Sequence, residues 1–148
     1  LDALRRELTE LFSLDDDDYA SVPFDGRPVE IREALQARVR AKYAEKEAVI
    51  PADIMRRVER DLMLQIVDTQ WKDHLYSLDH LKDGISLRSY GQRDPLVEYK
   101  KESYTLFQDM RSRIEAEMVR YLWWLRPVVD GGGESEVTLP DRTQFLGG

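Results

Sequence analysis

Two long segments with helical spacing, separated by an Asp-Pro step, constrain the fold of this chain most. In the first, about 52–85, the distal seam positions advance by three or four residues: Trp71, His74, Leu78, Leu81 and Ile85. In the second, which begins at Pro95, the spacing continues through Leu96, Tyr99, Ser103, Leu106, Met110, Ile114, Met118, Tyr121 and Leu125. Such spacing is typical of two helices that pack along one shared seam.

The connection between these segments is short, at about 86–94. Asp94 can cap the free N–H groups of a helix, and Pro95 suits the first helical position because its missing N–H costs nothing there. Two long helices with matching seams and a short connection pack antiparallel. The sequence therefore predicts an all-α fold built on a long antiparallel helical hairpin.

A smaller N-terminal helical unit is predicted for residues 1–50. One amphipathic helix carries Leu1, Leu4, Leu8, Leu11 and Phe12, and a second opens at Pro28 with Ile31, Leu35, Val39 and Tyr43 in a row. Between them runs Asp15 to Asp18. Adjacent carboxylates repel each other and no glycine-bearing calcium loop surrounds them, so a solvated loop is favoured over a metal site.

The chain divides into three predicted parts. Residues 1–50 form the N-terminal unit, residues 51–126 form the hairpin, and residues 127–148 form a flexible linker and tail after Pro127 and the Gly131–Gly133 run. From Val137 onward the tail is expected to be disordered or a short extended piece against a neighbour.

Composition excludes several classes of function. The net charge of -7 disfavours nucleic-acid binding, and the lack of cysteine excludes disulfides and thiolate metal sites. No run approaches the ~18 apolar residues of a membrane span. Phosphate-loop, G-x-S-x-G and H-E-x-x-H motifs are absent, so we expect these residues to hold no cofactor, no metal and no catalytic residue of their own.

Four aromatic or imidazole residues leave alternatives open. His74 and His80 fall on different sides of a helix, so a shared metal is disfavoured, and a hydrogen-bonded packing role is expected for His74 on the seam. The Trp123-Trp124 pair is interpreted as capping the hydrophobic seam or packing on another domain. Membrane-interface anchoring is the alternative, although no basic amphipathic face accompanies the pair.

The loop carries more apolar, aromatic and basic residues than a connection between two helices needs. It carries Leu87 and Tyr90, flanked by Arg88 and Arg93, and an aromatic ring at a tip can contact many kinds of side chain. Either these residues face a partner, or Leu87 and Tyr90 fold back onto the end of the hairpin. The candidate contact residues are Leu87, Arg88, Ser89, Tyr90, Gly91, Gln92 and Arg93.

Around this loop the sequence closely resembles SecA, the bacterial motor that drives preproteins through the SecY channel. The resemblance rests on W-K-x-H-L from Trp71, G-I-x-L-R-x-Y-x-Q-x-D-P from Gly84 to Pro95, and E-Y-K from Glu98. It reaches back more weakly through Tyr43-Ala44-Glu45-Lys46-Glu47 and covers roughly residues 1–126.

The resemblance implies that residues 1–50 are the end of the helical wing domain and that the hairpin is the two-helix finger of the helical scaffold domain. In the family this finger inserts into SecY, and a loop aromatic, matched here by Tyr90, touches the translocating polypeptide. The same region is implicated in restraining the ATPase. Ser89 and Gly91 depart from the family's usual Gly and Ala beside that aromatic.

The resemblance also implies that this chain is a piece of a larger protein. ATP and magnesium would be bound by nucleotide-binding domains absent from the sequence. The implied partners are the SecYEG channel, unfolded preproteins and the remaining SecA domains, with a homodimer possible through exposed seams. The implied location is cytoplasmic, at the inner membrane's cytoplasmic face. A purely structural scaffold or interaction module without preprotein contact is the alternative, and a stand-alone enzyme is disfavoured.

Overall fold

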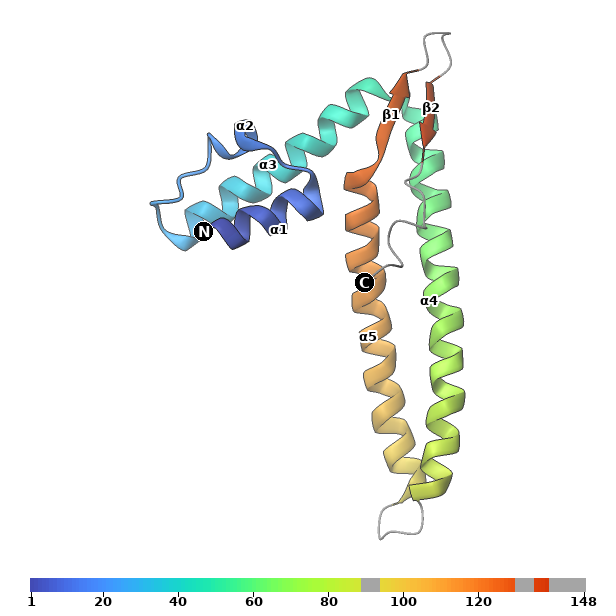
Figure 1. Cartoon of the computed structure of the whole chain (residues 1–148). Coiled ribbons are helices and arrows are strands. Elements are labelled where there is room, and N and C mark those ends of the chain that lie inside the picture. Colours follow the sequence, from blue (N-terminus) through green and yellow to red (C-terminus); the bar gives the residue numbers. More distant parts are fainter. Residues whose placement is uncertain (89–93, 130–134, 139–148) are drawn as a thin grey trace. The chain divides into compact units, whose positions relative to one another are not determined.

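A computed structural model describes residues 1–88, 94–129 and 135–138 (Figure 1). Its elements are α1 (Asp2–Phe12), α2 (Asp16–Tyr19), α3 (Pro28–Val49), α4 (Ala52–Arg88), α5 (Pro95–Trp124), β1 (Arg126–Val129) and β2 (Ser135–Thr138). The architecture is helical, as predicted. The one addition among these elements is the antiparallel β1–β2 pair, in which Arg126 lies opposite Thr138.

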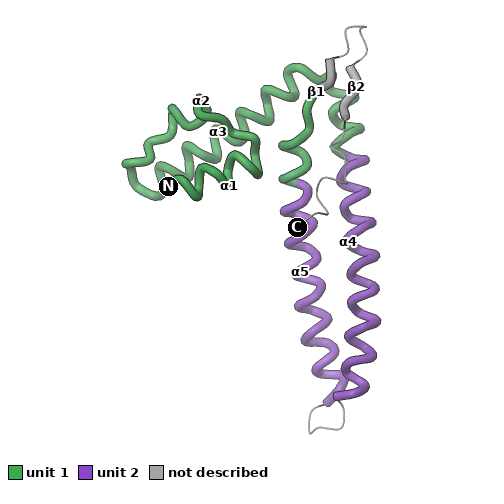
Figure 2. The backbone as a smooth tube through the Cα atoms, in the orientation of Figure 1, with its two compact units in different colours: residues 1–59, 119–148 green, residues 60–118 purple. Residues whose placement is uncertain are grey.

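The chain divides into two compact units (Figure 2). Residues 1–59 and 119–148 form unit 1, and residues 60–118 form unit 2. Because α4 and α5 are long, each contributes to both units. Unit 1 contains the first turns of α4 and the last turn of α5, and unit 2 contains the remainder of both helices.

Unit 2 is the helical hairpin. Contacts join Gln70 to Glu117, His74 to Phe107, and Arg88 to Glu102. As residue numbers rise along α4 they fall along α5, so the two helices are antiparallel, as their seams predict. The apolar side chains buried in this unit are Leu62, Ile66, Leu81, Ile85 and Met110.

The helix ends near the loop are close to the predicted ones. Asp94 Oδ1 accepts a hydrogen bond from the Leu96 N–H at 2.9 Å, which is the expected cap of α5. Helix α4 continues to Arg88 rather than ending at about Ile85. Gly84 therefore lies inside the helix, where a methyl group would meet no atom within 4 Å.

Unit 1 packs its helices around a small apolar core. The buried apolar side chains are Leu14, Tyr19, Val22, Ile50, Met55 and Leu125. Helix α3 opens at Pro28, as predicted, and Glu30 accepts a hydrogen bond from the Arg27 N–H just before it. Tyr19 donates its hydroxyl proton to the Arg5 carbonyl of α1 at 2.9 Å.

The prediction of a solvated loop at Asp15–Asp18 is right for the exposure of the first three residues and wrong for Asp18, which is buried, and for the helical turn that forms there. Asp15 and Asp18 cap each other's backbone N–H groups around the single turn α2, and Asp18 is only 2% exposed. Two cations from α3 meet the buried carboxylate: Arg38 and, at 2.9 Å, Lys42. The expected repulsion is outweighed because opposite charges come from a distant part of the sequence.

The same contacts set the protonation of Asp18. Burial by itself would raise the pKa of this carboxyl. Hydrogen bonds from the Asp15 N–H, Lys42 and Arg38 outweigh that effect and lower the pKa of Asp18 to about 2. The carboxylate therefore stays charged at every physiological pH.

Candidate functional site

The predicted contact loop joins α4 to α5. Ser89, Tyr90, Gly91, Gln92 and Arg93 lie outside the described residues, so the predictions made for them stay predictions. Of the candidate residues, Leu87 and Arg88 are described. Together with the first turn of α5, they define the end of the hairpin.

Three apolar side chains are strongly exposed at this end. Leu87 is 78% exposed, Leu96 59% and Val97 57%, and we call them the tip patch. Leu87 therefore does not fold back onto the hairpin. The assignment of Leu96 to the seam is wrong, because it belongs to the first turn of α5, before Tyr99 becomes half-buried. Exposed apolar side chains on both sides of a loop are surface that a partner can cover.

Arg88 pairs across the hairpin end with Glu102. Their side-chain atoms lie 2.6 Å apart, and the two side chains are 63% and 36% exposed. An ion pair this exposed contributes about 0.2–1 kcal/mol. The structure thus places Arg88 beside α5, with its charge partly satisfied within the hairpin.

An aromatic layer crosses the middle of the hairpin. His74 on α4 is 4% exposed and lies between Trp71 (5.6 Å between ring centroids) and Phe107 of α5 (5.8 Å). Its position on the seam is as predicted. Its Nδ1 atom, however, has no hydrogen-bond partner among the described residues. Ring packing holds His74, and the expected hydrogen bond is missing at Nδ1.

A polar layer lies one turn away, at Gln70. This side chain is 6% exposed; its amide donates to Glu117 at 2.9 Å and its oxygen accepts from Arg113 at 3.0 Å. Because all three groups must meet, the layer fixes how α4 and α5 align lengthwise. Sequence reasoning missed Gln70, although its position one turn before His74 on the buried face was a usable signal.

We use the term hairpin root for residues 52–59 of α4 and residues 119–125, which are the last turns of α5 and the residue after it; all belong to unit 1. Trp123 donates its indole N–H to the Val39 carbonyl of α3 at 3.0 Å, and Trp124 donates to the Glu10 carbonyl of α1 at 2.7 Å. Both indoles thus pack within unit 1, as the packing interpretation of this pair predicts.

Tyr43 on α3 connects both helices of the root. Its ring lies 4.8 Å from the Trp123 ring of α5, and its hydroxyl donates to Glu59 of α4 at 2.5 Å. Burial, followed by the hydrogen bond to Glu59, raises the pKa of Tyr43. The phenol therefore stays protonated and can donate its proton to the Glu59 carboxylate.

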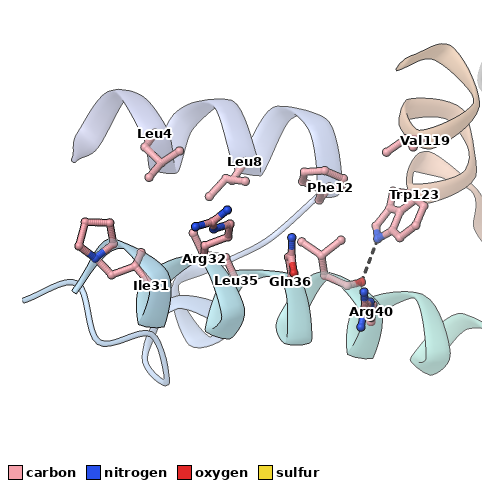
Figure 3. A pocket seen from close by; sticks show the side chains of 12 residues that line it. Leu4, Leu8, Phe12, Ile31, Arg32, Leu35, Gln36, Arg40, Val119 and Trp123 are labelled. Atoms are coloured by element: carbon pink, nitrogen blue, oxygen red, sulfur yellow. Dashed lines mark hydrogen bonds between the residues drawn. The ribbon is translucent and has the colours of Figure 1, made fainter. Parts of the chain in front are cut away.

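An apolar groove of about 700 Å³ runs between α1 and α3 in unit 1 (Figure 3). Its apolar lining includes Leu4, Leu8, Phe12, Ile31, Leu35 and Val39. Figure 3 shows Val119 and Trp123 of α5 at one end of it. Arg32 and Arg40 also line it. The mutual packing of α1 and α3 thus leaves part of both apolar faces uncovered.

Two kinds of site do not occur in the described part of the chain. No three His, Asp or Glu side chains there come together as a metal ion would require. No helix in the same residues combines the length and apolar character needed to cross a membrane.

Comparison with known proteins gives consistent matches. The family model described as SecA Wing and Scaffold domain matches residues 1–126. A protein translocase subunit SecA from Solibacter usitatus is 48% identical over 93% of this chain and 13% of its own length. The corresponding subunit from Geotalea uraniireducens is 50% identical over 67% of the chain and 11% of its own length. The chain thus spans only a small fraction of these relatives.

Proposed function

This chain belongs to the SecA wing and scaffold domain family, and from that premise we propose a role in protein export. It serves as the part of an ATP-driven translocase whose hairpin inserts into the mouth of the SecY channel. Its loop, with Tyr90 at the centre, contacts the translocating preprotein and helps to couple the state of the ATPase to movement.

The observation that carries this proposal is the tip patch. Leu87, Leu96 and Val97 expose apolar surface on both sides of the loop that contains Tyr90. Apolar and aromatic groups make contacts that tolerate many partner sequences, because they need no matched hydrogen bonds. A translocating chain presents every type of side chain in turn, so such a surface suits the task.

The layers behind the tip support a mechanical role. Gln70, Arg113 and Glu117 resist sliding of one helix along the other, and His74 packs against Phe107 beside them. A hairpin whose helices cannot slide is stiff along its axis. A displacement at one end is then delivered to the other.

The remaining chemistry lies outside this chain under the same proposal. ATP and magnesium are bound by other parts of the full-length protein, which acts at the cytoplasmic face of the inner membrane. Its partners there are the SecYEG channel and unfolded preproteins.

Tyr90→Ala in the full-length translocase tests the proposal. We expect preprotein translocation into membrane vesicles to fall at least about tenfold while basal ATP hydrolysis stays near the parent level, because the change removes a contact and no catalytic group. Tyr104→Ala is the matched control, since Tyr104 is a 66% exposed tyrosine on the same hairpin.

A photo-crosslinker at position 90 provides the direct readout. It should capture a stalled preprotein, whereas the same group at position 104 should not. Equal loss of transport and ATPase in Tyr90→Ala, or no loss of either, would contradict the proposal. A crosslink from neither position would favour the purely structural scaffold.

A further inference from the structure

The last turn of α5 leaves the Leu122 and Trp123 carbonyls without a partner within the helix. The last helical hydrogen bond runs from the Leu125 N–H to the Tyr121 carbonyl at 3.1 Å. A continuing helix would offer the Pro127 nitrogen to the Trp123 carbonyl, but proline has no N–H. The last turn of α5 also carries no basic residue to balance the negative end of the helix dipole.

Lys46 of α3 supplies the hydrogen-bond donors and the positive charge that the end of α5 lacks. Its ammonium group donates to the Trp123 carbonyl and, at 3.3 Å, to the Leu122 carbonyl. One cation from another helix therefore satisfies two free carbonyls and places a positive charge at the helix end. Burial, with smaller effects of Arg126 and Lys42, lowers the pKa of Lys46 to about 8, so the group is mostly charged at neutral pH.

Helix α3 also holds the start of α4. Tyr43 donates to Glu59 at 2.5 Å, and Glu47 pairs with Arg56, which in turn contacts Glu59 at 2.5 Å. Positions 43, 46 and 47 of a single helix thus hold both helices of the hairpin root.

We propose that Lys46 is a latch that fastens the last turn of α5 to α3, and that this latch positions the hairpin root during export. The second half of this statement rests on the proposed function. Without the latch, the last turn of α5 frays, while the Trp123 hydrogen bond to Val39 and its ring contact with Tyr43 still join α5 to α3. A displacement of α3 is then transmitted less firmly to α5 than to α4.

Hydrogen exchange in the full-length protein tests the latch itself. In Lys46→Met, which keeps most of the side chain's length but removes its charge and donors, backbone amides in peptides covering 119–126 should exchange about tenfold faster. Lys46→Arg keeps a charged donor and should stay within about twofold of the parent. Lys72→Met is the control, because Lys72 is an exposed cation paired with Asp68 within α4.

Exchange in Lys46→Met that stays at the parent rate would overturn the latch. Equally fast exchange in Lys46→Met and Lys46→Arg would overturn it as well, because a charged donor would then be irrelevant.

The amount of preprotein moved per ATP hydrolysed tests the role in export. We expect this ratio to fall severalfold in Lys46→Met, to recover in Lys46→Arg and to stay unchanged in Lys72→Met, at a temperature where all three remain folded. A purely stabilising role would lower transport and ATP hydrolysis together and leave the ratio constant. That result would overturn the positioning role.

Tyr90→Ala, measured in parallel, separates the two proposals. If it leaves transport intact, the proposed contact function fails while the exchange result for Lys46 still stands. If Tyr90→Ala impairs transport and Lys46→Met leaves the ratio unchanged, the latch alone fails as a positioning device.

Discussion

The root and the tip of the hairpin are built from the same two helices but differ in how far their side chains are buried. At the root, Leu125 and Met55 are completely buried, and donors from α3 and α5 meet backbone carbonyls. At the tip, Leu87 and Leu96 are mostly exposed and Arg88 forms a surface ion pair. We infer from this difference that truncating a buried side chain at the root costs more stability than truncating an exposed one at the tip.

Truncation of a buried side chain at the root should give the largest loss of stability, and it tests the contrast with the tip most directly. Leu125→Ala leaves a cavity at a fully buried position, so we expect the free energy of unfolding of this chain to fall by about 3 kcal/mol. Urea unfolding followed by circular dichroism measures the change. Leu87→Ala is the matched control at the tip and should stay within about 0.5 kcal/mol of the parent. Similar losses in both variants would remove the contrast.

The next largest loss of stability is expected at the buried ion cluster around Asp18, and an exposed ion pair serves as its comparison. Asp18→Asn removes the charge that Arg38 and Lys42 face, and should cost about 2 kcal/mol, whereas Arg88→Ala should cost less than about 1 kcal/mol. The same unfolding measurement reports both. Equal costs would mean that burial does not strengthen the Asp18 cluster.

The pH dependence of the Asp18 cluster follows from its pKa. The folded-state pKa of Asp18, about 2, lies below its ordinary value of 3.8. The folded state therefore favours the charged form, so this contribution is fully present above about pH 4 and is lost as the pH falls through about 2. Acid titration of the parent should show this loss, and Asp18→Asn should lack it. An identical acid profile in both would contradict the assignment.

A smaller effect is expected from a single hydroxyl group at the root. Tyr43→Phe keeps the ring against Trp123 but removes the donor to Glu59, and should cost about 1 kcal/mol. Thermal unfolding measures it, with Tyr104→Phe as a control because Tyr104 is an exposed hydroxyl in unit 2. A larger loss in the control would show that the root is not the more sensitive region.

The smallest effect on stability belongs to the tip patch. Leu87→Ser should change the free energy of unfolding by less than about 0.5 kcal/mol, since the side chain is already in solvent. In the full-length protein it should nevertheless reduce transport severalfold. Unchanged transport would indicate that the tip patch takes no part in contact.

Features that depend on residues close together in the sequence could be predicted, whereas features that depend on contacts between distant residues could not. The seams and the Asp94-Pro95 start depend on neighbours within a turn or two, and the hairpin was predicted correctly from them. Asp18 was predicted wrongly because its partners Arg38 and Lys42 lie on another helix. The role of Lys46 at the end of α5 was missed for the same reason.

The tip shows a different limit of sequence reasoning. Helical spacing alone assigned Leu96 to the seam, but spacing does not reveal where the contact between two helices begins. The loop residues from Ser89 to Arg93 lie outside the described part of the chain, so their assignment as a contact site still depends on the resemblance to the family and on the exposed tip patch beside them.

The Nδ1 atom of buried His74, which has no partner among the described residues, lowers the stability of this hairpin. An imidazole nitrogen without a hydrogen-bond partner costs about 1–3 kcal/mol where an apolar ring would cost nothing. A variant library screened only for heat resistance should therefore lose histidine at position 74. A library screened for export should retain it if the full-length protein gives that nitrogen a partner. The composition of position 74 in the two surviving populations would reveal which requirement shaped it.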